Sequence, residues 1–222
     1  MRQVLAVGLA FVLVPVIGCV GFPTTRSEPA TSPAAPAATS VATPAQAARL
    51  KQVMVPLLSV MDHPIQLDQV SVGLMKDPQI NAANAGGGRF FVTTGLLERA
   101  NDEHLRAVLA HEIAHEDLDH VAKAQVLAAG LGIGAALIDQ IFPGTGQVVP
   151  IAGELVARKY SRDEEFAADR HGVDLLERAG YRKEVMIEGL TWLMQASGDS
   201  GGGFFSTHPG TVERIDALRA AR

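Results

Sequence analysis

Hydrophobic and polar positions divide the chain into three stretches. An almost unbroken apolar run at residues 4–17 comes first. Residues 23–48 follow and are nearly all Pro, Ala, Ser or Thr, so they bury too little apolar surface to offset their ordering entropy. Beyond residue 48, apolar residues recur at the spacings of helices and strands. The pattern therefore predicts a leader at residues 1–18, a disordered linker at 19–46 and a folded domain at 47–222.

Within the folded domain, the pattern predicts a small sheet followed by helices. Alternating apolar residues and β-branched or aromatic side chains indicate short strands, and three consecutive glycines mark a turn between two of them. Asn101 or Asp102 can cap the long helix that follows. The expected elements are a helix over 49–61, strands over 70–74, 80–84 and 89–94, a helical turn over 96–100 and a long helix over 103–124. This order predicts a mainly helical α+β fold.

Composition and charge exclude two classes of protein. With 19 Lys and Arg residues against 24 Asp and Glu residues, the 222-residue chain has a formal net charge of −5. It therefore lacks the cationic field of a nucleic-acid binder, and we expect no nucleic-acid partner. Its single cysteine, Cys19, excludes a small domain held together by disulfides.

The first twenty residues have the features of an export signal. Arg2 precedes the apolar run, which is too short to span a bilayer comfortably. The run ends in Val16-Ile17-Gly18-Cys19, which resembles a bacterial lipobox. This resemblance implies removal of residues 1–18 and lipidation of Cys19, and the following Val20 favours the outer membrane, facing the periplasm. The alternative is an ordinary secretory signal or short anchor in which Cys19 is an incidental thiol.

The strongest chemical signal lies in the predicted long helix, at His111-Glu112-Ile113-Ala114-His115. Two histidines four residues apart project from one face of a helix and can bind one metal ion. A Zn²⁺ ion lowers the pKa of bound water to about 7, and Glu112 can then take the proton as general base. The motif therefore predicts one catalytic zinc per chain.

A catalytic zinc also needs a third protein ligand. The segment at residues 160–169 is predicted to be helical, with Glu165 and Asp169 four residues apart on one face. A glutamate from this segment would complete a set of two histidines and one carboxylate, with an open position for water. Asp169 could accept a hydrogen bond from a ligating histidine and fix its tautomer. The alternative is a solvated acidic face paired with Arg162 and Arg170.

His120 follows the histidine pair in the same predicted helix. It lies nine residues after His111, so the helix period places it on a different side from the pair. We therefore expect His120 to be structural or to support the ligands, and not to bind the metal itself.

Four motifs together resemble a known family. They are Asn81-Ala82 with Phe91-Val92-Thr93-Thr94-Gly95, His111-Glu112-x-x-His115, Ser161-Arg162-x-x-Glu165-Phe166-x-Ala168-Asp169, and Thr207-His208-Pro209 with Arg214-Ile215. Residues 50–219 thereby look like the gluzincin family of HtpX-like, BepA-like and CAAX-prenyl-protease endopeptidases. The resemblance implies a zincin-type domain in which Glu165, and not Glu164, is the third zinc ligand and Asp169 supports a ligand. It also implies that Asn81 lies on an edge strand that faces the active site and binds substrate.

Integral-membrane members of that family carry transmembrane helices, which we do not expect here. Residues 126–138 are apolar but too few to cross a bilayer, and residues 148–157 are fewer and include Glu154. We expect residues 126–157 to form a soluble helical hairpin, and a segment that dips into the membrane is the alternative. The chain therefore resembles a soluble, lipid-tethered branch of the family.

Two further features concern the catalysed reaction. His208 is a candidate donor to the oxyanion, and it could instead occupy the open zinc position at rest. A histidine that merely packs at a helix start is the alternative. The segment of Arg89, Phe90, Phe91 and Val92 is expected to offer a strand edge, on which an extended substrate pairs through its backbone.

These features predict a zinc-dependent endopeptidase that hydrolyses unfolded or misassembled envelope proteins, as proteolytic quality control. Pairing through backbone atoms tolerates many sequences and suits such substrates. The alternative is a non-proteolytic, chaperone-like module that binds envelope proteins. The intact Glu112 favours the enzyme, because an inactive module could lose its base and still keep its metal ligands.

Overall fold

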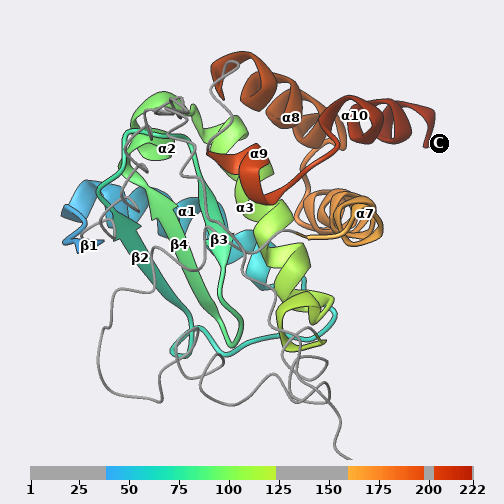
Figure 1. Ribbon diagram of the computed structural model, residues 1–222. Coiled ribbons are helices and arrows are strands. Elements are labelled where there is room, and N and C mark those ends of the chain that lie inside the picture. Colours follow the sequence, from blue (N-terminus) through green and yellow to red (C-terminus); the bar gives the residue numbers. More distant parts are fainter. Residues whose placement is uncertain (1–38, 124–159, 198–202, 222) are drawn as a thin grey trace, which may run out of the picture. The chain divides into compact units, whose positions relative to one another are not determined.

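The computed structural model describes residues 39–123, 160–197 and 203–221. Its strands form one sheet in the order β1-β2-β4-β3 (Figure 1). Strands β2 and β4 are parallel, whereas β1 pairs antiparallel with β2 and β3 pairs antiparallel with β4. The strands are β1 (Thr39–Ser40), β2 (Ser71–Met75), β3 (Ala82–Asn84) and β4 (Arg89–Thr93).

Helix α3 is the centre of the helical part. It packs against α1, α7, α8 and β3, and it runs beside β3 in Figure 1. Its buried face includes Leu105, Leu109 and Ile113, each 0% exposed. The helices are α1 (Pro44–Leu58), α2 (Thr94–Arg99), α3 (Asp102–Asp117), α7 (Arg162–Arg178), α8 (Glu184–Ser197), α9 (Phe204–Thr207) and α10 (Thr211–Ala220). The prediction of a mainly helical α+β fold is confirmed.

The ordered chain extends into the range that the sequence predicted as linker. Strand β1 pairs with β2, and α1 begins at Pro44 instead of residue 49. A capping box fixes this start, because the Gln46 N–H donates to Thr43 Oγ1 at 3.3 Å and the Thr43 N–H donates to Gln46 Oε1 at 2.9 Å. Helix α1 thus begins three residues before the predicted start of the folded domain at residue 47. Alanines, which are good helix formers, follow this cap.

Helix α3 ends earlier than predicted. Its last residue is Asp117, and Asp119 has a left-handed backbone with a φ of 56°. Aspartate tolerates this conformation better than most residues, so the chain turns there and helical backbone resumes at His120. One unbroken helix over residues 103–124 was therefore a wrong prediction.

The position of β4 corrects a second prediction. β4 lies between β2 and β3, so Arg89–Val92 is an interior segment and not a strand edge. Phe90 and Val92 are buried in the core, at 1% and 0% exposure. Beyond β3, no further strand pairs with the sheet in the part of the chain that the structure describes. The edge nearest α3 therefore belongs to β3.

Within the described residues, no helix combines the length and the apolar character needed to cross a membrane. The predicted leader, its Cys19 and the segment at 126–157 fall outside the described ranges. The expectations for them stay predictions.

Candidate metal centre

Helix α3 brings two histidine rings together. His111 and His115 are one helical turn apart, and their Nε2 atoms are 3.0 Å from each other. The two residues are 1% and 0% exposed, because α7 and α8 cover this face of α3. Glu112, between them in sequence, is 0% exposed as well. The centre of α3 therefore places three polar side chains in the protein interior.

Helix α7 supplies a carboxylate to this pair. Ser161 caps the helix, and its N–H donates to Glu164 Oε2 at 2.8 Å, so Glu164 serves the cap. The next residue, Glu165, faces inward and is 0% exposed. Its Oε2 lies 3.5 Å from His111 Nε2, and its Oε1 lies 3.4 Å from His115 Nε2. Glu164 thus caps α7, whereas Glu165 contacts the two histidines.

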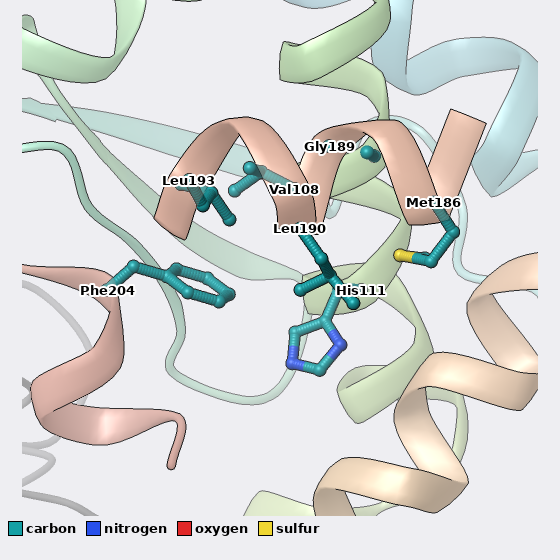
Figure 2. Close-up of a pocket in the computed structure, with 8 residues that line it drawn as sticks. Val108, His111, Met186, Gly189, Leu190, Leu193 and Phe204 are labelled. Atoms are coloured by element: carbon teal, nitrogen blue, oxygen red, sulfur yellow. The ribbon is translucent and has the colours of Figure 1, made fainter. Parts of the chain in front are cut away.

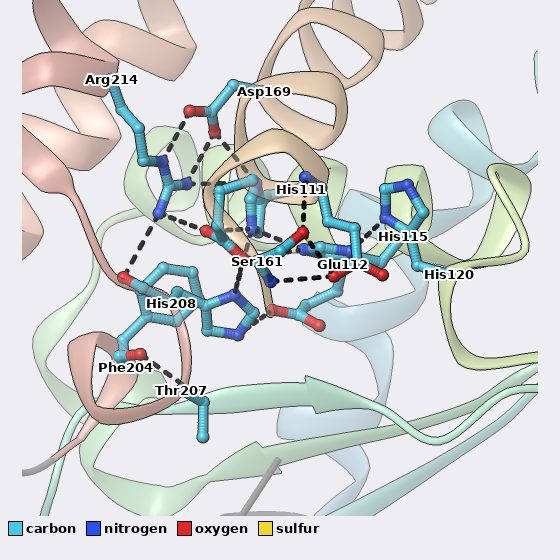
Figure 3. Close-up of polar contacts among 12 residues, drawn as sticks. His111, Glu112, His115, His120, Ser161, Asp169, Phe204, Thr207, His208 and Arg214 are labelled. Atoms are coloured by element: carbon cyan, nitrogen blue, oxygen red, sulfur yellow. Dashed lines mark hydrogen bonds and ion pairs between the residues drawn. The ribbon is translucent and has the colours of Figure 1, made fainter. Parts of the chain in front are cut away.

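His208, just after α9, completes the cluster (Figure 3). Its Nδ1 is 3.3 Å from His111 Nε2 and 3.0 Å from Glu165 Oε1. Its Nε2 is 3.3 Å from Glu112 Oε1. One ligand atom from each of His111, His115, Glu165 and His208 lies within 4.8 Å of the others.

The distances within this cluster fit a bound metal ion. A tetrahedral ion with bonds of ~2.1 Å has its ligands ~3.4 Å apart. Five pairs of these nitrogen and oxygen atoms are 3.0–3.5 Å apart. The buried charges agree, because three carboxylates (Glu112, Glu165 and Asp169) face one guanidinium (Arg214). A divalent cation would neutralise the two remaining negative charges.

Asp169 and Arg214 support the cluster from behind. Asp169 Oδ1 lies 3.0 Å from His111 Nδ1, which holds Nε2 of the same ring toward the other ligands. Arg214, from α10, donates its Nε and Nη2 hydrogens to the two Asp169 oxygens at 2.7 Å each. Its Nη1 also pairs with Glu165. The sequence alternative of a solvated acidic face is wrong, because Glu165 and Asp169 are 0% and 1% exposed.

No role was predicted for Arg214, although it belongs to the fourth motif. It is 1% exposed, and Leu218, four residues later on the same side of α10, is also buried. The signal in the sequence was the four-residue spacing of Arg214 and Leu218, which puts both on one side of a helix. An arginine on the side that is buried needs carboxylate partners.

His120 lies against His115, although the helix period placed it on a different side, and the supporting role expected for it stays a prediction. Its Nδ1 is 2.8 Å from His115 Nδ1, because the turn at Asp119 carries it back toward the end of α3. Tyr160, which the sequence analysis did not single out, stacks on the His115 ring with centroids 3.7 Å apart. If Nε2 of His115 faces a metal, its Nδ1–H donates to His120.

Burial and charge set the protonation of the cluster. Burial lowers the pKa of His111, but the charge of Glu165 and the hydrogen bonds to Asp169 and Glu165 together outweigh it and raise that pKa to about 9. Burial also lowers the pKa of His208, but Glu112 and Glu165 together outweigh burial and raise that pKa. The pKa of His115 falls well below its ordinary value, mainly because of burial. Burial raises the pKa of the Glu165 carboxyl, but His111 and His208 hold it far below its usual range.

The predicted substrate-binding residues lie in different surroundings. Phe90 and Val92 belong to the core, and the Arg89 Nε–H donates to the Gly86 carbonyl at 3.1 Å. Phe91, from the middle of β4, is half-buried. Asn81, just before β3, is 5% exposed, and its N–H donates to Thr93 Oγ1 at 3.0 Å.

An apolar pocket instead adjoins His111, between α3 and α8 (Figure 2). Phe204 of α9 stands at this pocket and is 0% exposed. The lining residues are Ala107, Val108, His111, Met186, Gly189, Leu190, Leu193 and Phe204.

Comparison with known proteins identifies the family. Residues 44–222 match a family model described as Peptidase family M48. The chain belongs to peptidase family M48. This M48 chain is 28% identical over 151 residues to Metalloprotease YcaL of Escherichia coli (strain K12), which covers 63% of the chain and 57% of that protein.

Two further relatives of the M48 chain are similar to the same extent. Protease HtpX homolog of Bacillus subtilis (strain 168) is 27% identical over 186 residues, covering 67% of the chain and 62% of that protein. Metalloprotease LoiP of Escherichia coli (strain K12) is 27% identical over 145 residues, covering 63% and 58%. The chain thus spans about three fifths of the length of these relatives. The resemblance to HtpX-like endopeptidases is confirmed.

Proposed function

We propose that this chain is a zinc-dependent endopeptidase. The observation that supports this most is the state of Glu112. Its carboxylate is fully buried beside the His111, His115 and Glu165 cluster, and apart from the ion pair of Oε1 with His208 at 3.3 Å, neither oxygen accepts a hydrogen bond from the described residues. A buried carboxylate without such a bond is costly unless it has a task. Next to a metal site, that task is to hold and deprotonate a water molecule.

His111, His115 and Glu165 would hold the metal through two nitrogens and a carboxylate, the donor set of catalytic zinc. When bound, the ion supplies Lewis-acid activation of water and of the scissile carbonyl. Glu112 takes the proton of the attacking water and later delivers it to the leaving amine. Asp169 keeps the His111 tautomer fixed throughout, and Arg214 keeps Asp169 ionised.

His208 has two possible tasks in this scheme. Its Nδ1 lies with the ligand atoms and its Nε2 lies beside Glu112, so in this arrangement it occupies the position that water needs. Turnover therefore requires His208 to withdraw from that position. Once withdrawn, its ring can donate a hydrogen bond to the oxyanion.

We further propose that the substrates are unfolded or misassembled envelope proteins. An extended chain can pair with the outer edge of β3, which lies against α3. Such pairing uses backbone atoms and needs an unfolded segment. The lipobox-like sequence at Cys19 supports a lipid anchor, with the domain on the periplasmic side of the outer membrane.

Cleavage of casein and of a denatured outer-membrane protein by the zinc-loaded protein tests the proposal. Glu112→Gln should lower the rate at least ~100-fold while zinc content stays unchanged, because only the base is lost. Glu103→Gln, an exposed change on the same helix, is the matched control and should keep full activity. Equal rates for wild type and Glu112→Gln would refute the mechanism. Binding of the denatured protein without cleavage would favour a chaperone-like module.

A further inference from the structure

A second group of ligand-type side chains lies apart from the metal centre. Asp62 follows α1, Asp117 ends α3, and His171 belongs to α7. One ligand atom from each of the three lies within 4.8 Å of the other two. His171 Nε2 is 2.7 Å from Asp117 Oδ2 and 3.9 Å from Asp62 Oδ2. None of these residues takes part in the proposed peptidase reaction.

The surroundings hold Asp117 as an ionised and oriented carboxylate. Its side chain is 0% exposed and accepts the N–H groups of Asp62 and His63, at 2.8 Å and 2.7 Å. The carboxylate is therefore held in place, with Oδ2 at 2.7 Å from His171 Nε2.

One oxygen of Asp62 lies on the side of Asp117 and His171. Its Oδ1 pairs with Arg178 Nη1 at 2.6 Å, whereas its Oδ2 is the oxygen nearest His171 Nε2. The Asp62 side chain is 57% exposed, so an ion can reach it from solvent. His63, whose ring is 75% exposed, places Nδ1 at 3.3 Å from Asp117 Oδ1.

We propose that Asp62, Asp117 and His171 form a second binding site for a divalent transition-metal ion such as Zn²⁺. Imidazole nitrogen and carboxylate oxygen are ligands that Zn²⁺ and Co²⁺ accept. The ion takes the place of the hydrogen bond between Asp117 Oδ2 and His171 Nε2. Bound there, it joins the connection after α1 to α3 and α7 and stabilises the fold.

Cobalt binding to the full chain, stripped of metal with a chelator, tests this site. We expect two equivalents of Co²⁺ to be retained through gel filtration by the wild type. The His111→Ala/His115→Ala variant should retain one, with a visible absorption band, and should gain several degrees in Tm when Co²⁺ is added. His171→Gln keeps a donor toward Asp117 and should likewise retain one equivalent.

Two further variants sharpen the result. Arg178→Gln should bind the second equivalent several-fold more tightly, because it removes a cation from beside Asp62. His104→Ala, a histidine that stacks on Trp192 outside both clusters, should retain both equivalents. The proposal is overturned if the wild type and His171→Gln retain equal amounts of Co²⁺, or if His104→Ala loses as much as His171→Gln. Neither result depends on whether the chain cleaves peptides.

Discussion

Metal binding at the proposed catalytic centre should release protons, and their number reports on His208. With no metal bound, the pKa of His111 is raised to about 9, so this imidazole is protonated at pH 7. The pKa of His208 is raised as well, because Glu112 and Glu165 outweigh the effect of burial. A metal ligand must give up its proton, so each imidazole that binds the ion releases one. We expect about two protons at pH 7.

The pH dependence follows with a definite sign. Because a pKa near 9 lies two units above pH 7, displacing the His111 proton costs about 3 kcal/mol at pH 7. That cost weakens the apparent metal affinity about 100-fold relative to pH above 9, and it grows as the pH falls further. His208 adds to this slope in the same direction, since its pKa is also raised.

Isothermal titration calorimetry in buffers of different ionisation enthalpy measures the proton count directly. His171→Gln protein should be used throughout, so that only one site is titrated. His208→Gln on that background should lower the count to about one and keep metal binding. A count near zero would refute the protonation assigned to His111. If His208→Gln leaves the proton count unchanged, His208 does not lose a proton when the metal ion binds.

Two other predictions concern residues behind the ligands. Arg214→Met should lower the free energy of unfolding of chelator-treated protein by about 3–5 kcal/mol, since it removes the guanidinium that pairs with both oxygens of the buried Asp169. The corresponding fall in Tm is about 10 °C, measured by circular dichroism. Arg214→Lys should lower the Tm less, and an equal fall in both variants would contradict the bidentate pairing. His120→Ala should weaken zinc binding about 10- to 100-fold in a chelator competition, because His115 loses its acceptor. His120→Asn should restore part of this affinity, and no loss in His120→Ala would exclude a positioning role.

Local sequence patterns were sufficient for the parts of the site that depend on short spacings. His111 and His115 share a helix face because four residues make about one turn. Glu165 could be placed on a helix with Asp169 for the same reason, but its distance from the histidines is a tertiary fact. The resemblance to a family supplied that pairing, and the structure places Glu165 within 3.5 Å of both rings.

Other features could not be read from local patterns. The position of β4 inside the sheet depends on its parallel pairing with β2, and strand order is not encoded in the alternation of either strand. His120 was placed on the wrong side because one left-handed residue, Asp119, resets the helix phase. Arg214 reaches Asp169 across two helices that lie far apart in sequence.

Strand β1 is only two residues long, yet it determines how the sheet can grow. It pairs along β2 and so occupies the sheet edge opposite β3. An unpaired edge is a template for any extended polypeptide, including misfolded neighbours. With β1 in place, and within the described residues, the free template is the β3 side, which packs against the helix that bears His111 and His115. Under the proposed function, a chain recruited by strand addition would thereby reach the side of the sheet that bears His111 and His115, and the opposite side would not compete for it.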